Sequence, residues 1–368
     1  MSSGLADNVR KFRRAAGLSQ EGLAHESGLG DEANRRYLVE LRKALMPPVG
    51  LAAPLTDPGE AGDLTVLRRE IADSDALYQA DRYGSVAKRL PRLLRSTEAT
   101  VAVAEAEERQ QAVIVRAHAL LLAGKYLTQV RQYDMAYYAL AEGIRLARET
   151  GQTLTTATGV VGMCWLLLRQ DRFDESEHLA AVTAAEMEPR ISQASPGHLA
   201  VWGELWLRVA SSTVRNNRPQ EAREARRMAG TAASALGKQF CVFGQNWGNF
   251  GPVTAELKVV EDLSIADDAR GVLRRADDGL LSTKAISAYG NPGVNSWGRH
   301  RLDVAKAHVT LGSHQDAMSE LDQLRRNSGE WLTHQPMARY VMSDLLASRK
   351  RTLTQDMREM AAHLGIKH

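Results

Sequence analysis

The chain has 368 residues, of which 44% are hydrophobic and 25% charged, and its formal net charge is +3. This composition excludes an intrinsically disordered chain and is typical of a globular protein large enough for one small and one large domain. No apolar run is long enough to span a bilayer, and the first residues lead into a charged segment rather than a signal-peptide core, so we expect a cytoplasmic protein without membrane contacts.

The first thirty residues have the pattern of two short helices. Leu5, Val9 and Phe12 fall on one face of the first, whose other faces are basic. Ser19 is a suitable N-cap for the second, and Gly28 is suited to end it.

The segment from Phe12 to Gly30 resembles the first part of the Xre/Cro-type helix-turn-helix family. In that family a recognition helix follows and enters the major groove of DNA. Here the chain passes from Gly30 almost directly to residues 35–45, which match the closing helix of such a domain. The resemblance therefore implies a truncated helix-turn-helix domain over residues 1–49, in which loss of the recognition helix weakens or alters DNA binding.

Five residues of this domain are candidates for DNA contact. Residues 34–36 could form a substitute reading helix, because Asn and Arg are residue types that read base edges. The alternative is that they are solvated charges on a helix that packs against the first two. Residues 1–51 have only a small excess of basic side chains, which favours this alternative. The candidates are Ser19, Gln20, Asn34, Arg35 and Arg36.

Residues 50–62 are rich in Pro and Gly and have no regular period, which predicts a linker. Beyond it almost every segment has helical periodicity, and short polar turns precede Ala-rich amphipathic stretches about every 40 to 50 residues. A period in this range made of helix pairs is typical of an α-solenoid, whose concave face is lined by the first helix of each pair. The predicted turns are residues 82–84, 132–134, 172–174, 218–220, 265–267 and 313–315.

Two of these units, residues 170–187 and 310–324, resemble tetratricopeptide repeats. Together with the N-terminal part, they make the chain similar to an actinobacterial group of helix-turn-helix regulators with tetratricopeptide-like C-terminal domains, and residues 353–366 match the closing helix of that group. The resemblance implies an all-α protein with a degenerate helix-turn-helix domain followed by a solenoid over residues 63–368. It also implies a homodimer, in which the solenoid senses a peptide or small molecule and changes the spacing of two DNA-binding heads.

The tryptophans all lie in the second part of the chain. Five of them fall on, or just before, the first helix of a predicted pair, so they could face the concave surface, where aromatic rings anchor ligands. The alternative is that they pack between layers of helices.

Residues 240–252 have the most unusual composition, rich in glycine, side-chain amides and aromatic rings. In the related regulators an FGPTNVxLH motif stands at this place. Phe250 and the two residues after it match that motif, whereas Val253, Thr254 and Lys258 replace its Thr, Asn and His. If the segment faces the ligand, this chain has different chemistry there.

A second Gly- and Asn-rich stretch, residues 289–301, could face the first across a groove. Together they supply amide and indole donors with an Arg and a His, which suits an anionic or amide-bearing ligand. Capping and turn formation explain the same Gly and Asn residues equally well. The ligand-binding residues that we predict are Trp165, Trp202, Trp206, Asn246, Trp247, Asn249, Phe250, Asn295, Trp297 and Arg301.

Motifs for metal, cofactor or covalent chemistry are missing. The histidines form no metal-binding motif, Cys164 and Cys241 are far apart, and no phosphate loop or nucleophile elbow is present, so we expect neither a metal nor a cofactor. The sequence favours a binding protein and leaves an enzyme open. The readings are a ligand-responsive regulator, a repurposed member that acts through its pocket as a small-molecule-binding protein or cofactor-independent biosynthetic enzyme, and a scaffold for a peptide or another protein.

Overall fold

The computed structural model describes residues 32–48, 59–348 and 353–366. Within these ranges every regular element is a helix, and the one β pairing is an isolated bridge between Phe240 and Phe250. The predicted all-α class is therefore confirmed for the described residues. The two helices predicted before residue 31 lie outside them, as does most of the predicted linker.

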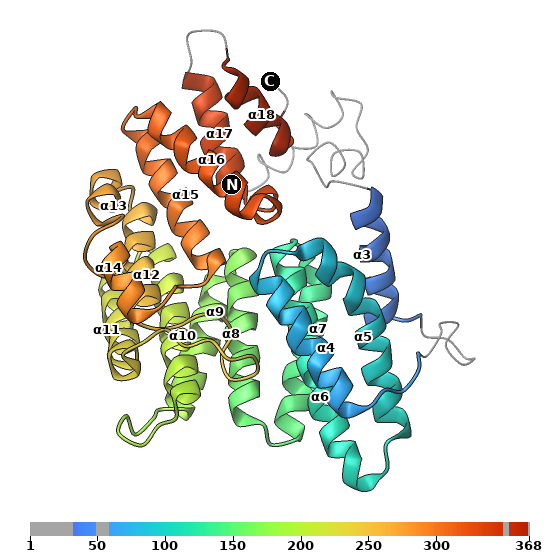
Figure 1. The fold of residues 1–368 in the computed structure, drawn as a ribbon. Coiled ribbons are helices and arrows are strands. Elements are labelled where there is room, and N and C mark those ends of the chain that lie inside the picture. The colour runs from blue at the N-terminus through green and yellow to red at the C-terminus, as the bar shows by residue number, and fades with distance from the viewer. Residues whose placement is uncertain (1–31, 49–58, 349–352, 367–368) are drawn as a thin grey trace, which may run out of the picture.

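The helices follow one another along an arc, from the blue N-terminal helices through green and yellow to the red C-terminal ones (Figure 1). They are α3 (Glu32–Leu45), α4 (Leu64–Gln79), α5 (Tyr83–Val103), α6 (Ala106–Gln129), α7 (Tyr133–Glu149), α8 (Thr153–Arg169), α9 (Phe173–Glu186), α10 (Pro196–Arg215), α11 (Pro219–Leu236), α12 (Pro252–Ile265), α13 (Ala269–Arg275), the 3-10 turn η1 (Gly279–Leu281), α14 (Thr283–Tyr289), α15 (Val294–Thr310), α16 (His314–Thr333), α17 (Pro336–Ser348) and α18 (Gln355–His363).

The same backbone turn ends the first helix of six successive pairs. In each turn one residue has a positive φ, and the N–H of the next residue donates to the carbonyl five positions earlier. Arg131, for example, has φ 64°, and the Gln132 N–H lies 2.9 Å from the Leu127 oxygen. This Schellman arrangement satisfies carbonyls at a helix C-terminus. The turns lie where the sequence predicts them, and their positive-φ residues are Asp81, Arg131, Asp171, Asn217, Asp267 and Gly312.

Small residues let the paired helices approach closely. Ala136 and Ala139 of α7 are fully buried. A Cβ added at Gly143 of the same helix would lie 2.9 Å from a methyl carbon of Leu121 in α6. Any larger side chain at these positions would force the pair apart.

One hydrophobic core extends from α3 to α18, and a smaller cluster joins α12, α13 and α15. Leu41 and Leu45 of α3 belong to the large core, and α3 packs on α5. Complete burial of a leucine contributes about 1.5–3 kcal/mol. The last helix of the N-terminal segment is therefore held by the same core as the rest of the described chain.

The two ends of the arc meet through side chains. The Tyr83 hydroxyl, at the start of α5, lies 3.1 Å from Oδ1 of Asn295 at the start of α15. The Gly84 N–H donates to Oε1 of Glu330 in α16, and the Tyr83 ring meets that of His334 edge to face. These contacts join the start of α5 to the start of α15 and to the C-terminal part of α16. In the described part of the chain, no helix combines the length and hydropathy needed to cross a membrane.

Candidate functional site

Two adjoining cavities, of about 80 and 350 Å³, lie between the first helices of successive pairs. Trp165 of α8 and Arg299 of α15 line both cavities, so we treat the two as one channel. The other lining residues come from α4, α6, α7, α10, α12, α17 and the segment between α11 and α12.

Trp165 is at the centre of a cluster of arginines. The guanidinium carbons of Arg169 and Arg299 each lie 4.4 Å from the centroid of its ring, and that of Arg208 lies 5.2 Å away. Trp165 and Arg169 are one turn apart on α8, whereas Arg208 comes from α10 and Arg299 from α15. Cations at these distances are attracted by the indole ring, and Trp is the aromatic side chain that attracts them best.

These three arginines have no carboxylate partner among the described residues. Their Nε atoms are buried without any hydrogen-bond acceptor. Arg299 donates from Nη2 to the Gln129 amide oxygen, at 3.2 Å, and Arg169 and Arg208 make no hydrogen bond within the described chain. The three side chains are half-buried, but a buried N–H donor such as these Nε groups normally finds an acceptor, so this arrangement is unusual.

The electrostatics of the cluster are unfavourable without an anion. Burial lowers the pKa of Arg169 to about 9, and the positive charge of Arg299 adds to the effect. Burial also lowers the pKa of Arg208; the negative charge of Glu204 opposes this shift, and the charge of Arg299 adds to it. The channel as a whole is lined by eight Lys and Arg side chains against four Asp and Glu side chains. This local excess of positive charge is larger than the +3 of the entire chain.

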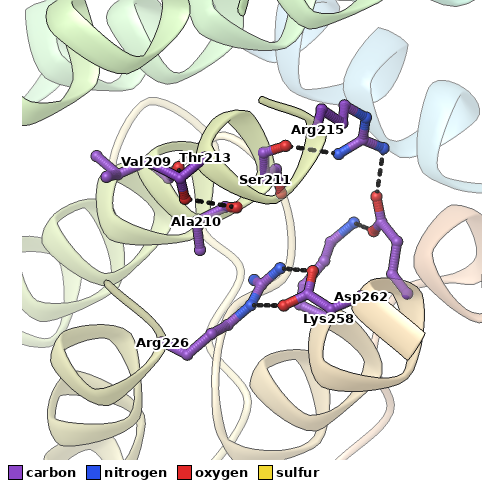
Figure 2. A network of polar contacts seen from close by, with 9 residues as sticks. Val209, Ala210, Ser211, Thr213, Arg215, Arg226, Lys258 and Asp262 are labelled. Carbon is purple, nitrogen blue, oxygen red and sulfur yellow. Dashed lines mark hydrogen bonds and ion pairs between the residues drawn. The ribbon is translucent and has the colours of Figure 1, made fainter. Parts of the chain in front are cut away.

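A neighbouring group of charges, by contrast, is fully paired (Figure 2). Arg215 of α10 donates to Glu261 of α12 at 2.9 Å, and Lys258 donates to the other oxygen of the same carboxylate. Arg226 and Asp262 form a bidentate pair that joins α11 to α12. These contacts hold α12 against α10 and α11. The arginines around Trp165, in contrast, keep N–H donors that have no acceptor among the described residues.

The pKa values of this group follow from burial and charge. Burial would raise the pKa of Glu261, but the charges of Lys258 and Arg215 outweigh it and hold that pKa well below the ordinary carboxyl value. Burial lowers the pKa of Lys258 to about 8. Asp303 accepts a hydrogen bond from the Ser264 hydroxyl at 2.8 Å, and burial raises its pKa to about 7.

Hydrogen bonds and close packing hold the segment between α11 and α12 so that Trp247 lines the channel. The buried carboxylate of Glu204 accepts the N–H groups of Trp247 and Gly248, at 2.9 and 2.8 Å. The indole ring lies against Gly162 of α8, where an added Cβ would be 2.3 Å from a ring carbon. Burial raises the pKa of Glu204.

Four of the ten ligand-binding residues predicted from the sequence line the channel. They are Trp165, Trp247, Asn249 and Asn295.

Asn246 and Phe250 have structural positions within the same segment. The Asn246 side chain bonds to backbone groups of Phe240 and Val242, and Phe250 is fully buried against Gly203.

The other four predicted ligand residues point away from the channel. Trp202 is buried and donates its indole N–H to the Ala184 oxygen of α9, and Trp206 packs edge to face against it. Trp297 packs in the smaller core, and Arg301 is ion-paired with Asp277 and Glu320. These residues serve helix packing because they lie on the faces of α10 and α15 that meet other helices.

The DNA-binding candidates stay predictions. Ser19 and Gln20 lie outside the described residues, as do the side chains of Asn34 and Arg35, and Arg36 is exposed on α3.

The three arginines of the channel were missed because composition alone does not mark them. Aligning the chain on the six turns would have found two of them, Arg169 and Arg208. The lining residues recur at fixed distances before the positive-φ residue of their own turn. Six residues before it lie Trp165, Glu261 and Lys306. Nine residues before it lie Arg208 and Asp303, and two residues before it lie Arg169 and Arg215. These offsets follow one face of a helix. A polar side chain that recurs there, on helices otherwise buried, is the signal of a lined channel.

Comparisons of the chain with protein-family models, curated proteins and solved structures find no match.

Proposed function

We propose that the protein is a ligand-responsive, regulator-like protein, in which a truncated helix-turn-helix head over residues 1–49 precedes a tetratricopeptide-like α-solenoid over residues 63–368. The solenoid binds a small molecule in the channel around Trp165. The recurrence of one turn at six places and the position of the channel residues at fixed offsets from it support the repeat architecture.

The observation that carries the proposal is the lining of the channel. Two tryptophan rings, several side-chain amides and the unpaired arginines of α8, α10 and α15 converge on one space. A concave site with aromatic walls and a few polar groups is the usual form of a small-molecule site. A helical core without a ligand would bury apolar side chains there instead.

Ligand binding could be transmitted to the head through α3. Leu41 and Leu45 share the core of α4 and α5, Glu40 lies 3.8 Å from Arg95, and the Lys88 ammonium lies over the Tyr37 ring. A shift of the first pair would therefore move the helix that closes the head.

The regulator part of the proposal is tested by a gel-shift titration. The full chain is titrated at about 0.1 M salt onto the DNA upstream of its own gene and onto unrelated DNA of equal length, because phosphate contacts depend on salt. A regulator prefers its own upstream DNA, and it should sediment as a dimer. Equal binding to both DNAs would contradict the proposal that the protein is a regulator. The channel would then be the functional part of the protein.

A cofactor-independent enzyme is the second candidate, and Lys258 and Asp303 favour it. Both line the channel, and their pKa values of about 8 and about 7 lie close to neutral pH, as those of catalytic acids and bases do. The test is incubation of a cell extract with wild type and Lys258→Met. An enzyme consumes at least one compound that the variant leaves intact, and identical extracts contradict the candidate.

A further inference from the structure

We propose that the ligand carries an oxyanionic group, a phosphate or a carboxylate, which is held by the guanidinium groups of Arg169, Arg208 and Arg299 around Trp165. The inference rests on the proposed ligand-binding function and names the chemistry of the ligand.

Apart from Nη2 of Arg299, which donates to the Gln129 amide oxygen, the N–H donors of the three arginines have no acceptor in the described chain. A guanidinium that stacks on an aromatic ring uses its face, and its N–H groups, which lie in its plane, stay available for oxygen atoms. The three side chains come from α8, α10 and α15 and lie within 5.2 Å of one ring centroid. Arginine forks match the geometry of carboxylate and phosphate oxygens, and charged hydrogen bonds of this kind are the strong ones.

The carboxylates that line the channel cannot take the place of such an anion. Glu204 accepts two backbone N–H groups, Glu261 holds Arg215 and Lys258, and Asp303 accepts from Ser264. Asp171, the remaining acid of the lining, is exposed at its turn. Among the described residues no acid is left for the three arginines, so we take their partner to be the ligand.

The two cavities suggest how the rest of the ligand is placed. The smaller one, beside Trp247, Asn249 and Asn295, is about the size of a compact polar group. The larger one continues past Arg299 to Tyr133 and Met337 and has room for an organic body. We therefore expect a small organic acid or phosphate ester rather than an inorganic ion as the natural ligand.

The experiment is thermal unfolding of the full chain in inorganic phosphate, in pyrophosphate and in citrate, with chloride added to keep ionic strength constant. The variants are Arg169→Gln and Arg299→Gln. The matched control is Arg89→Gln, which removes the same charge from an exposed position of α5. We expect the midpoint of wild type to rise with at least one anion, and the apparent dissociation constant to increase at least tenfold in the two channel variants and not in the control.

A second readout separates this site from a general salt effect. Without added anion, Arg169→Gln should unfold at a higher temperature than wild type, because it removes one of three like charges that lie around the Trp165 ring without an ion pair. A response to phosphates alone assigns the oxyanion to a phosphate, and a response to citrate alone assigns it to a carboxylate.

Equal responses of wild type and both channel variants would overturn the inference. Native mass spectrometry that finds an uncharged molecule retained by wild type would also overturn it, while leaving ligand binding in the channel intact.

Discussion

At the scale of single residues, some charged side chains of the helices form ion pairs with carboxylates, whereas the arginines of the channel do not. Ion pairs such as Arg226 with Asp262 stabilise the joints between helices, whereas Arg169, Arg208 and Arg299 face one another without an acid in the described chain. Leaving a buried cation unpaired costs several kcal/mol in ordinary proteins. Such a cost is tolerated where function uses the charge, and this is the physical basis for placing the function in the channel.

Asp303 gives a prediction for the pH dependence of stability. Burial, helped by the charge of Glu261, raises its pKa from 3.8 to about 7 in the folded chain. Between these values the folded state holds a proton that the unfolded state has lost, so the free energy of unfolding falls as pH rises, by up to about 1.4 kcal/mol per pH unit. Above pH 7 the effect levels off.

Asp303→Asn removes this dependence. Urea denaturation between pH 5 and about pH 8 should show the variant gaining stability relative to wild type up to the folded pKa of about 7 and keeping a constant difference above it. Parallel pH profiles would show that Asp303 ionises normally and that its surroundings are wetter than the contacts indicate.

At the scale of elements, the turns were predictable and the faces of the helices were not. A Schellman turn depends on a short stretch of sequence, in which polar residues surround one residue that adopts the left-handed conformation. For this reason all six turns lie at their predicted places. Which face of a helix meets the channel depends on its phase relative to the turn. For that reason Trp165 lines the channel whereas Trp202 and Trp206 of α10 face α9 or each other.

The convergence of the three arginines on one ring could not be predicted, even though their helix face can be found by aligning the turns. Arg169, Arg208 and Arg299 are far apart in sequence, and only the curvature of the helix stack brings α8, α10 and α15 around one ring. Curvature is the sum of small rotations at each pair, which no single segment encodes.

Two glycines in helices test the packing of Trp247 on α8. Gly162→Ala places a Cβ 2.3 Å from a carbon of the Trp247 ring, whereas a Cβ at Gly230 of α11 meets nothing within 4 Å. We expect Gly162→Ala to destabilise the protein by about 1–3 kcal/mol, because the rigid ring has to move. Gly230→Ala should stabilise it by about 0.5–1 kcal/mol through its effect on the helix backbone. Chemical denaturation measures both, and changes of the same sign would contradict this packing.

At the scale of the whole molecule, the arc is closed by few side chains. Tyr83 and Asn295 join the first pair to α15, and Arg299 lies one turn beyond Asn295 on that helix. A ligand that binds Arg299 would therefore also stabilise the contact between Tyr83 and Asn295. Because α3 packs on α5, and α5 on α4, the ligand would also restrict the position of α3.

A double-mutant cycle tests the closing contact. Tyr83→Phe removes the contacts of its hydroxyl with both Asn295 and Asp81, whereas Asn295→Ala removes only the first. The two changes share the contact between Tyr83 and Asn295, so their effects on the free energy of unfolding should be non-additive by about 0.5–1.5 kcal/mol. Tyr138→Phe on α7, where the ring is 45% exposed, is the control for Asn295→Ala and should add without coupling. Additivity in both pairs would mean that the ends do not meet in solution.

The most direct test of the central claim is hydrogen exchange of the full chain with and without the anion that binds best. We expect protection to increase in residues 161–170 of α8, 203–212 of α10 and 295–303 of α15, around Trp165, and Arg169→Gln to abolish the increase. Protection confined to other helices, or a midpoint shift in the absence of any change in these three segments, would contradict a ligand site in the channel.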